Sequence, residues 1–236
     1  MPNKTIHYIW LGGKKKPHVI RQCIKSWRKF FPGWDIKEWN ESNVNLDINR
    51  YCRQAYDARK YAFASDVLRF DILYRYGGIY FDTDVKVLKS FAPLMEQCDA
   101  FSGFENECVA PGLVLYSKEP NNPLFAQMLK SYEEREFLTK ANGYDLKTVV
   151  QQFTEILIEH GLVCNNTLQT VDGFTVFPKE YFCPADYSGI LSNQTDNTYS
   201  VHLFAASWLP RRDKCKLVAR KWILKLLGPF RRKRRN

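Results

Sequence analysis

The chain of 236 residues lacks any run of eighteen apolar residues, so we expect no segment that spans a membrane. It also lacks a basic-then-apolar leader, because the chain opens with MPN and runs into KTIHYIW, and we expect no secretory signal. No CxxC pair occurs among its seven scattered cysteines. This argues against a zinc site or a disulfide framework and favours reduced thiols in the core.

Acidic residues are nearly absent from the last 26 residues. Residues 211–236 contain twelve Lys or Arg and one Asp, a net charge of +11, while the whole chain carries +10. The body is therefore close to neutral. A nucleic-acid-binding fold usually spreads basic residues over a face of the folded body, so we expect no nucleic-acid partner.

The same C-terminal segment alternates apolar and basic residues in CKLVARKWILKLLG, residues 215–228, and continues into RRKRR. Such spacing is typical of a helix that lies in the interface of an anionic membrane, although it also fits a helix that covers the core and ends in a solvated tail. We predict one domain over residues 1–210 and a membrane-associating tail over 211–236. The expected location is cytoplasmic, on the inner face of a bacterial membrane.

The order of apolar patterns predicts an α/β fold. TIHYIW, residues 5–10, reads as a buried strand, residues 20–31 have helical spacing, and WDIKEW, residues 34–39, reads as a second strand. This β-α-β opening favours a parallel sheet covered by helices. Later strands are expected near residues 99–105, 112–117, 174–178 and 199–204, and helices near residues 123–132 and 146–160.

The stretch GGIYFDTDV, residues 77–85, has two aspartates one residue apart after an apolar segment. Residues 79–87, IYFDTDVKV, are expected to form one strand, on which Asp82 and Asp84 would project from the same side, about 6–7 Å apart. Two carboxylates so close raise each other's pKa, whereas a shared Mg²⁺ or Mn²⁺ that also binds phosphate would stabilise both. A solvated strand end that carries two acids is the alternative.

Asp66 and Arg69 lie three residues apart on the preceding helix and share one face. Because Gly77 and Gly78 turn the chain back, we expect this face to meet the aspartate pair. Asp66 could then accept hydrogen bonds from ligand hydroxyls, and Arg69 could bind hydroxyls or phosphate. A plain ion pair on a helix is the alternative.

Three motifs together resemble the DxD glycosyltransferases of family 32. They are SDVLRFDILYRYGGIYFDTDV (residues 65–85), IHYIWLGG (residues 6–13) and HLFAASW (residues 202–208). The resemblance implies a GT-A fold, that is, a single Rossmann-like domain with a mostly parallel mixed sheet flanked by helices. It also implies hexosyl transfer with retention of configuration from a nucleotide sugar. Residues from about 110 to 195 match the family less closely.

The resemblance also implies roles for individual residues. Asp66, Arg69 and Asp84 would be catalytic. The metal, Mn²⁺ or Mg²⁺, would be bound by Asp82, Asp84 and His202, where the alternative for His202 is a hydrogen-bonded strand histidine. The nucleotide sugar would be bound by Ile9, Trp10, Asp66, Arg69, Tyr80, Asp82, Asp84, Ser207 and Trp208.

The predicted activity is transfer of a hexose, from UDP by analogy, to a glycan acceptor, expected to be lipid-linked, in the synthesis of a surface polysaccharide. Two other hypotheses stay open at this point. One is a toxin-like transferase that acts on a protein hydroxyl, and the other is a non-enzymatic protein that binds membrane or nucleic acid through its basic tail. His7, inside an apolar strand, is expected to be structural.

Overall fold

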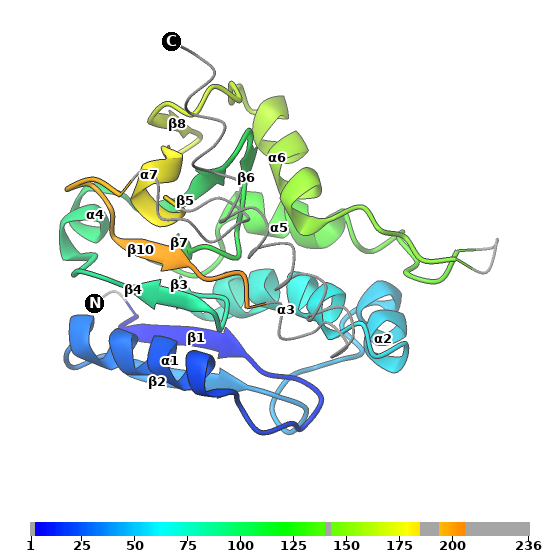
Figure 1. The fold of residues 1–236 in the computed structure, drawn as a ribbon. Coiled ribbons are helices and arrows are strands. Elements are labelled where there is room, and N and C mark those ends of the chain that lie inside the picture. Colours follow the sequence, from blue (N-terminus) through cyan, green and yellow to red (C-terminus); the bar gives the residue numbers. More distant parts are fainter. Residues whose placement is uncertain (1–2, 140–142, 185–193, 206–236) are drawn as a thin grey trace, which may run out of the picture.

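A computed structural model describes residues 3–139, 143–184 and 194–205. The predicted domain boundary at residue 210, Ser207, Trp208 and the basic tail lie outside the described residues. Figure 1 shows the chain folded around one central sheet with helices on both sides. None of the helices within these ranges is long and apolar enough to cross a membrane.

The central sheet is mixed, in the order β2-β1-β3-β7-β5-β9-β8, and β6 pairs with β5 at one end. β1 runs parallel to both β2 and β3, and β5 runs parallel to β9, while β7 and β8 are antiparallel to their neighbours. The strands are β1 (Thr5–Ile9), β2 (Asp35–Trp39), β3 (Gly78–Tyr80), β5 (Ala100–Glu105), β6 (Cys108–Val109), β7 (Leu115–Ser117), β8 (Gln169–Val171) and β9 (Phe174–Phe177). A second, two-stranded antiparallel sheet pairs β4 (Val85–Val87) with β10 (Ser200–His202).

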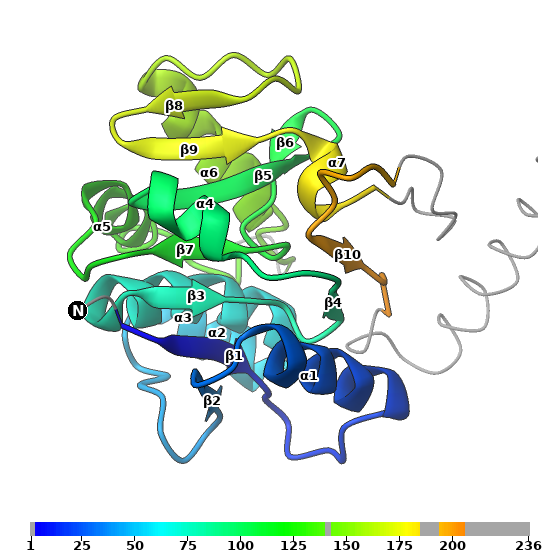
Figure 2. The ribbon, with the colours of Figure 1, turned by 90° about the vertical axis from the view of Figure 1, so that its left-hand side faces the viewer.

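Two helical layers cover the sheet, and each has its own apolar core. One layer contains α2 (Arg50–Asp57), α3 (Tyr61–Tyr76), α5 (Pro123–Lys130) and α6 (Val149–Glu159). The other contains α1 (His18–Phe30), α4 (Ala92–Gln97) and α7 (Lys179–Phe182), together with β4 and β10. Figure 2 shows α1 and α4 in front of the sheet and α3 behind it. The predicted α/β class and the β-α-β opening are confirmed.

Helix α3 is the central helix of the fold, and its sequence explains its position. Residues 67–73 are all buried, so the helix is packed on several sides. It ends at Gly77, which adopts φ of +64° and donates a hydrogen bond to the carbonyl oxygen of Leu73. The turn at Gly77 sends the chain directly into β3, as predicted from the Gly-Gly pair.

One predicted element is wrong. Residues 79–87 form two short strands in different sheets instead of one extended strand, because the chain turns between them. The backbone N–H of Val85 donates to the carbonyl oxygen of Asp82 at 3.0 Å, which closes the turn. Asp82 and Asp84 therefore lie in a turn and do not share one side of a strand.

His7 is structural, as its apolar strand predicts. Its side chain is buried in β1, where Trp39 Nε1 donates to Nδ1 at 3.0 Å and Nε2 lies 3.0 Å from the carbonyl oxygen of Gly77. An indole nitrogen only donates, so Nδ1 must accept and Nε2 must carry the proton. The ring thus ties β1, β2 and the end of α3 together.

Candidate active site

The carboxyl ends of β1 and β3 meet at one edge of the sheet, because the two strands are parallel neighbours. His7 is paired with Tyr80, so Ile9 lies at the level of Asp82 further along the same edge. Ile9 is buried, whereas Trp10 on the loop that follows is half-buried and donates from Nε1 to the carbonyl oxygen of Lys14 at 2.6 Å. Open α/β sheets bind ligands at such an edge.

A cluster of four polar side chains forms at this edge. Arg69 of α3 lies 2.7 Å from Asp66 Oδ1 and 3.3 Å from Asp82 Oδ1, so one guanidinium joins the helix to the end of β3. The Tyr80 hydroxyl donates to the same Asp82 oxygen at 2.8 Å, and its ring lies 5.0 Å from the guanidinium carbon. The structure therefore brings together two residues of α3 and two residues at the end of β3, as predicted.

Burial controls the charges of this cluster. Only 4% of the Arg69 side chain is exposed. Burial opposes its charge, but attraction to Asp82, Tyr80 and Asp66 keeps the pKa above its ordinary value. Burial raises the pKa of Asp66 to about 6, although Arg69 opposes this shift. Asp66 is thus a carboxylate that is ionised near neutral pH and has hydrogen-bonding capacity left for a ligand.

Asp84 faces a different partner, the C-terminal part of the described chain. His202 Nε2 lies 3.2 Å from Asp84 Oδ1, and the backbone N–H of Ala205 donates to Oδ2 at 2.8 Å. The backbone N–H of Leu203 also donates to the Asp84 carbonyl oxygen at 3.0 Å, next to the β4–β10 pairing. The turn from Asp82 to Val85 therefore connects the Arg69 cluster to the segment that leads into residues 206–208.

The electrostatics of this pair are those of an ion pair. Burial favours the neutral acid of Asp84, but attraction to His202 and the hydrogen bonds it accepts lower its pKa. Burial lowers the pKa of His202, and Asp84 and Glu105 overcome this effect and raise it to about 10. Glu105 Oε1, at the end of β5, lies 3.7 Å from His202 Nδ1.

Two of the three predicted metal ligands lie side by side. The 3.2 Å between Asp84 Oδ1 and His202 Nε2 is the distance of their ion pair, so a cation bound by both would have to replace the proton on Nε2. Asp82 is turned towards Arg69 instead. Among the residues described here, no three His, Cys, Asp or Glu side chains are already gathered for a metal. The donor set fits a cation through Asp84 and His202, and convergence of Asp82 would require its carboxylate to turn.

Gly112 is a site residue that the sequence analysis missed. It lies in the turn before β7, and its carbonyl oxygen accepts from the backbone N–H of Asp82 at 3.0 Å. A Cβ atom there would lie 2.1 Å from Asp82 Oδ2 and 3.1 Å from an Arg69 guanidinium nitrogen. The Pro111-Gly112 pair signals a turn, but no local pattern indicates that its backbone supports a carboxylate 30 positions earlier.

Comparison with known proteins finds a family match over the segment that contains most of these residues. Residues 17–101 match the family model described as a glycosyltransferase sugar-binding region containing a DXD motif. That segment includes Asp66, Arg69, Asp82 and Asp84, but not His202.

Two curated proteins are similar in sequence. An uncharacterized glycosyltransferase of Acanthamoeba polyphaga mimivirus is 24% identical, and the match covers 92% of this chain and 87% of the relative. Subversion of eukaryotic traffic protein A of Legionella pneumophila is 25% identical over 56% of this chain, and the match spans a quarter of that protein's length.

Among solved structures, the PaToxG glycosyltransferase superposes with a TM-score of 0.50 at 22% identity, and the match covers 67% of this chain and 68% of that one. This likeness shows the fold and agrees with the predicted GT-A architecture. The matched sugar-binding region and the named relatives indicate the activity. These findings identify the chain as a glycosyltransferase with a DXD sugar-binding region in residues 17–101.

Proposed function

We propose that the chain is a retaining, metal-dependent hexosyltransferase of family 32 that uses a UDP-sugar. The observation that carries this proposal is the arrangement around the turn from Asp82 to Val85. An Asp-Arg-Asp cluster lies on one side of the turn and an Asp-His pair on the other. A nucleotide sugar needs both, because its hexose presents hydroxyls and its diphosphate presents negative charge.

In this proposal Asp84 and His202 would hold Mn²⁺ or Mg²⁺, and the charge of that ion would offset the negative charge that develops on the departing nucleoside diphosphate. Asp66 accepts hydrogen bonds from hexose hydroxyls. Arg69 donates to hydroxyls or phosphate, and Asp82 and Tyr80 orient its guanidinium. Ile9 and Trp10, at the end of β1, would contact the base and ribose. Ser207 and Trp208, which stay a prediction, would close over the diphosphate.

A panel of sugar nucleotides tests the proposal. Hydrolysis or transfer should require Mn²⁺ or Mg²⁺, should stop with EDTA, and should recover when the metal is restored. Product anomers assigned by NMR test retention. Turnover that persists with EDTA would contradict metal dependence, and failure of every sugar nucleotide to bind would contradict the donor class.

Two classes of acceptor are candidates for the transferred hexose. The first is a lipid-linked glycan at the cytoplasmic face of a bacterial membrane. The second is a protein hydroxyl, the acceptor of the toxin-like alternative. Radiolabelled transfer with separate glycolipid and protein fractions as acceptors distinguishes them, because label should enter only one fraction.

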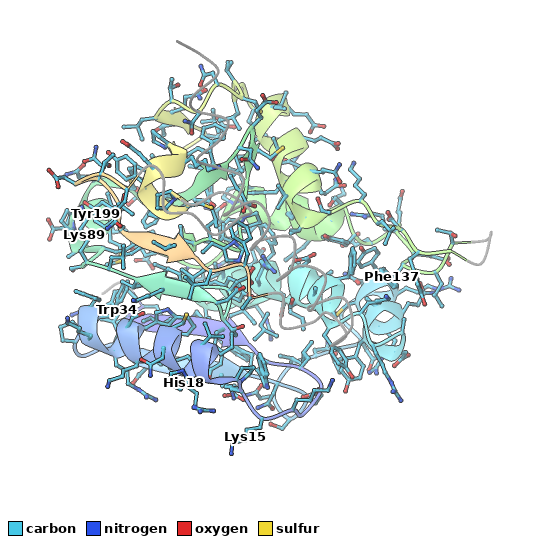
Figure 3. All side chains as sticks on the ribbon, viewed as in Figure 1. Lys15, His18, Trp34, Lys89, Phe137 and Tyr199 are labelled. Atoms are coloured by element: carbon cyan, nitrogen blue, oxygen red, sulfur yellow. The ribbon has the colours of Figure 1, made fainter. Side chains whose placement is uncertain are left out.

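A basic cleft on α1 supports a membrane-peripheral location. The cleft, about 980 Å³ in volume, lies between α1 and β4 and includes Arg21, Lys25, Arg28, Lys29 and Lys86. None of these five cations is ion-paired with another described residue, and α1 contains no acidic residue. Figure 3 shows Lys15 and His18 on the outer side of the same region. Anionic headgroups attract such unpaired cations by about 1 kcal/mol each.

Co-sedimentation measures this binding. Phosphatidylcholine vesicles with and without phosphatidylserine should distinguish charge-dependent binding, and Lys25→Glu with Lys29→Glu should weaken it. Lys60→Glu with Lys130→Glu, both on the opposite helical layer, changes the net charge equally and should not. Removal of residues 211–236 measures the separate share of the tail. Equal binding by all these proteins would contradict the membrane proposal.

A further inference from the structure

His202 has a second ring nitrogen that the contact with Asp84 does not use. Nε2 lies 3.2 Å from Asp84 Oδ1, whereas Nδ1 is buried and has no hydrogen-bond partner within the described residues. Glu105 Oε1 lies 3.7 Å from Nδ1, somewhat beyond hydrogen-bond length. Buried polar groups are nearly always paired, so an unpaired nitrogen beside a carboxylate at the candidate site calls for a functional explanation.

Glu105 is held firmly in the fold. It is the last residue of β5, a strand in the interior of the central sheet, and it is paired with Cys108 of β6. Its Oε1 accepts from the Cys183 thiol, with 3.8 Å between the two atoms. Only 13% of the Glu105 side chain and 16% of the His202 side chain are exposed. The carboxylate is therefore a fixed and largely desolvated acceptor beside the imidazole.

The two carboxylates contact different sides of the imidazole. Nε2 and Nδ1 point away from each other across the ring, so Asp84 lies on one side and Glu105 on the other. The strand that carries His202 is fixed as well, because His202 is paired with Val85 in the β4–β10 sheet. Glu105 is thus placed to orient the ring, and it does not share the ligand that Asp84 would contact.

The chemistry of a histidine ligand explains why such an acceptor is needed. Histidine binds a cation in its neutral form, through a nitrogen that carries no proton. If Nε2 is the ligand, the proton of the ring must be on Nδ1, and this buried N–H needs an acceptor. Glu105 Oε1 can serve, because a shift of roughly 0.7 Å would close the 3.7 Å gap to hydrogen-bond length.

We propose that Glu105 is a positioning residue that accepts the Nδ1–H of His202 and thereby presents Nε2 to a divalent cation beside Asp84. The hydrogen bond selects the tautomer of the ring and fixes its orientation, since the bond made by one ring nitrogen determines what the other can bind. The inference rests on the proposed function, because it supports the histidine assigned there to the metal.

The test measures the binding of Mn²⁺ alone to the full chain, with free Mn²⁺ followed by its EPR signal. Glu105→Leu removes the acceptor, so the Kd for Mn²⁺ should rise roughly ten- to a hundred-fold, the range for a lost outer-shell partner of a metal ligand. Glu105→Gln keeps an oxygen that can accept from Nδ1, so its Kd should stay within about threefold of wild type. In a His202→Gln background, where no ring remains to orient, Glu105→Leu should have no further effect.

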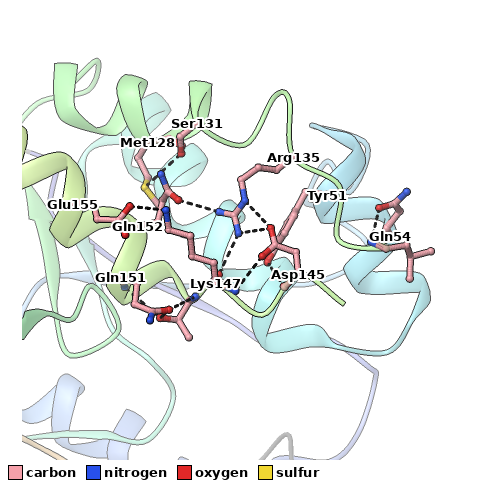
Figure 4. Close-up of polar contacts among 12 residues, drawn as sticks. Tyr51, Gln54, Met128, Ser131, Arg135, Asp145, Lys147, Gln151, Gln152 and Glu155 are labelled. Atoms are coloured by element: carbon pink, nitrogen blue, oxygen red, sulfur yellow. Dashed lines mark hydrogen bonds and ion pairs between the residues drawn. The ribbon is translucent and has the colours of Figure 1, made fainter. Parts of the chain in front are cut away.

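Two controls separate this effect from a general loss of structure. Glu155→Leu also removes a glutamate, but Glu155 is paired with Lys147 on α6, in the helical layer on the other side of the sheet (Figure 4). Its Kd for Mn²⁺ should equal that of wild type. Urea unfolding shows which variants are folded, and Glu105→Ala repeats the test if the leucine variant is not.

The outcomes separate this inference from the proposed function. Wild-type affinity for Mn²⁺ in a folded Glu105→Leu variant would overturn the role of Glu105 and leave the transferase proposal intact. An equal loss in Glu105→Leu and Glu105→Gln would also overturn it, because it would indicate the charge of Glu105 and not a hydrogen-bond acceptor. A wild-type chain that binds no Mn²⁺ would overturn the metal dependence of the proposed function, and the role of Glu105 would fall with it.

Discussion

Acid should destabilise this protein through His7, whose side chain is buried in β1. The neutral ring accepts from Trp39 and donates to Gly77, so a second proton on Nδ1 would face the indole N–H directly. Burial, with a smaller contribution from Lys37, lowers the pKa of His7 from 6.5 to about 4, although the hydrogen bond to Gly77 opposes the shift. A folded-state pKa below the unfolded value means that the stabilisation is complete above pH 6.5.

The stabilisation is lost as pH falls from 6.5 towards 4, because the unfolded chain binds the proton first. A shift of about 2.5 units corresponds to about 3.4 kcal/mol in full, and about 2 kcal/mol of it should be lost between pH 7 and pH 5. His7 is 1% exposed, so solvent screening does not reduce this figure greatly.

Urea unfolding of the wild type and of His7→Gln at pH 7 and pH 5 measures the effect. The glutamine can donate to Gly77 but does not titrate, so its loss of stability over this interval should be about 2 kcal/mol smaller than that of the wild type. His18→Gln is the matched control, because His18 is exposed on α1 and should leave the wild-type loss unchanged. If wild type and His7→Gln lose the same stability, the reasoning about the buried ring is wrong.

Three further predictions concern the site. Gly112→Ala should lower kcat/KM more than tenfold, because the new Cβ atom displaces the Asp82 carboxylate. The stability cost should be only about 1 kcal/mol, because that carboxylate can swing away. Steady-state kinetics and urea unfolding check this, and wild-type kinetics would contradict it. Asp84→Asn should abolish metal-stimulated turnover yet keep a folded chain, since an amide oxygen can still accept from Ala205, and a Mn²⁺ titration of activity and circular dichroism decide the point. Activity should fall as pH drops through about 6, where Asp66 takes up a proton, and a pH–rate profile without that decline would refute its role as a carboxylate.

The fold was largely predictable because its signals are local. Helical spacing from Ile20 to Phe31 and the Gly77-Gly78 stop depend on neighbours a few residues apart, and the structure has both where they were expected. The prediction of one strand over residues 79–87 was wrong because their apolar alternation suits one strand as well as two. The hydrogen bond that separates β3 from β4 joins Asp82 to Val85, and the pairing of β4 depends on β10, more than 100 residues away.

The candidate site was predicted in its residue types and only partly in its contacts. Asp66, Arg69, Tyr80 and Asp82 do meet, since helix periodicity and a tight turn bring them to one edge. Gly112 was missed because its importance comes from distant packing, since its backbone lies against the Asp82 carboxylate. No spacing rule connects positions so far apart in the chain.

The division of the two aspartates has a mechanistic consequence. Asp82 shares its partner Arg69 with Asp66, the carboxylate proposed to bind hexose, whereas Asp84 shares His202 with the segment that leads to residues 206–208. A ligand that contacts both aspartates would therefore bind on both sides of the turn between them. If a diphosphate binds at Asp84 as proposed, its binding is linked to the position of residues 203–205, because the same carboxylate accepts from Ala205 and contacts the histidine. Loss of either contact should weaken nucleotide binding without disturbing the Arg69 cluster, which has its own hydrogen bonds.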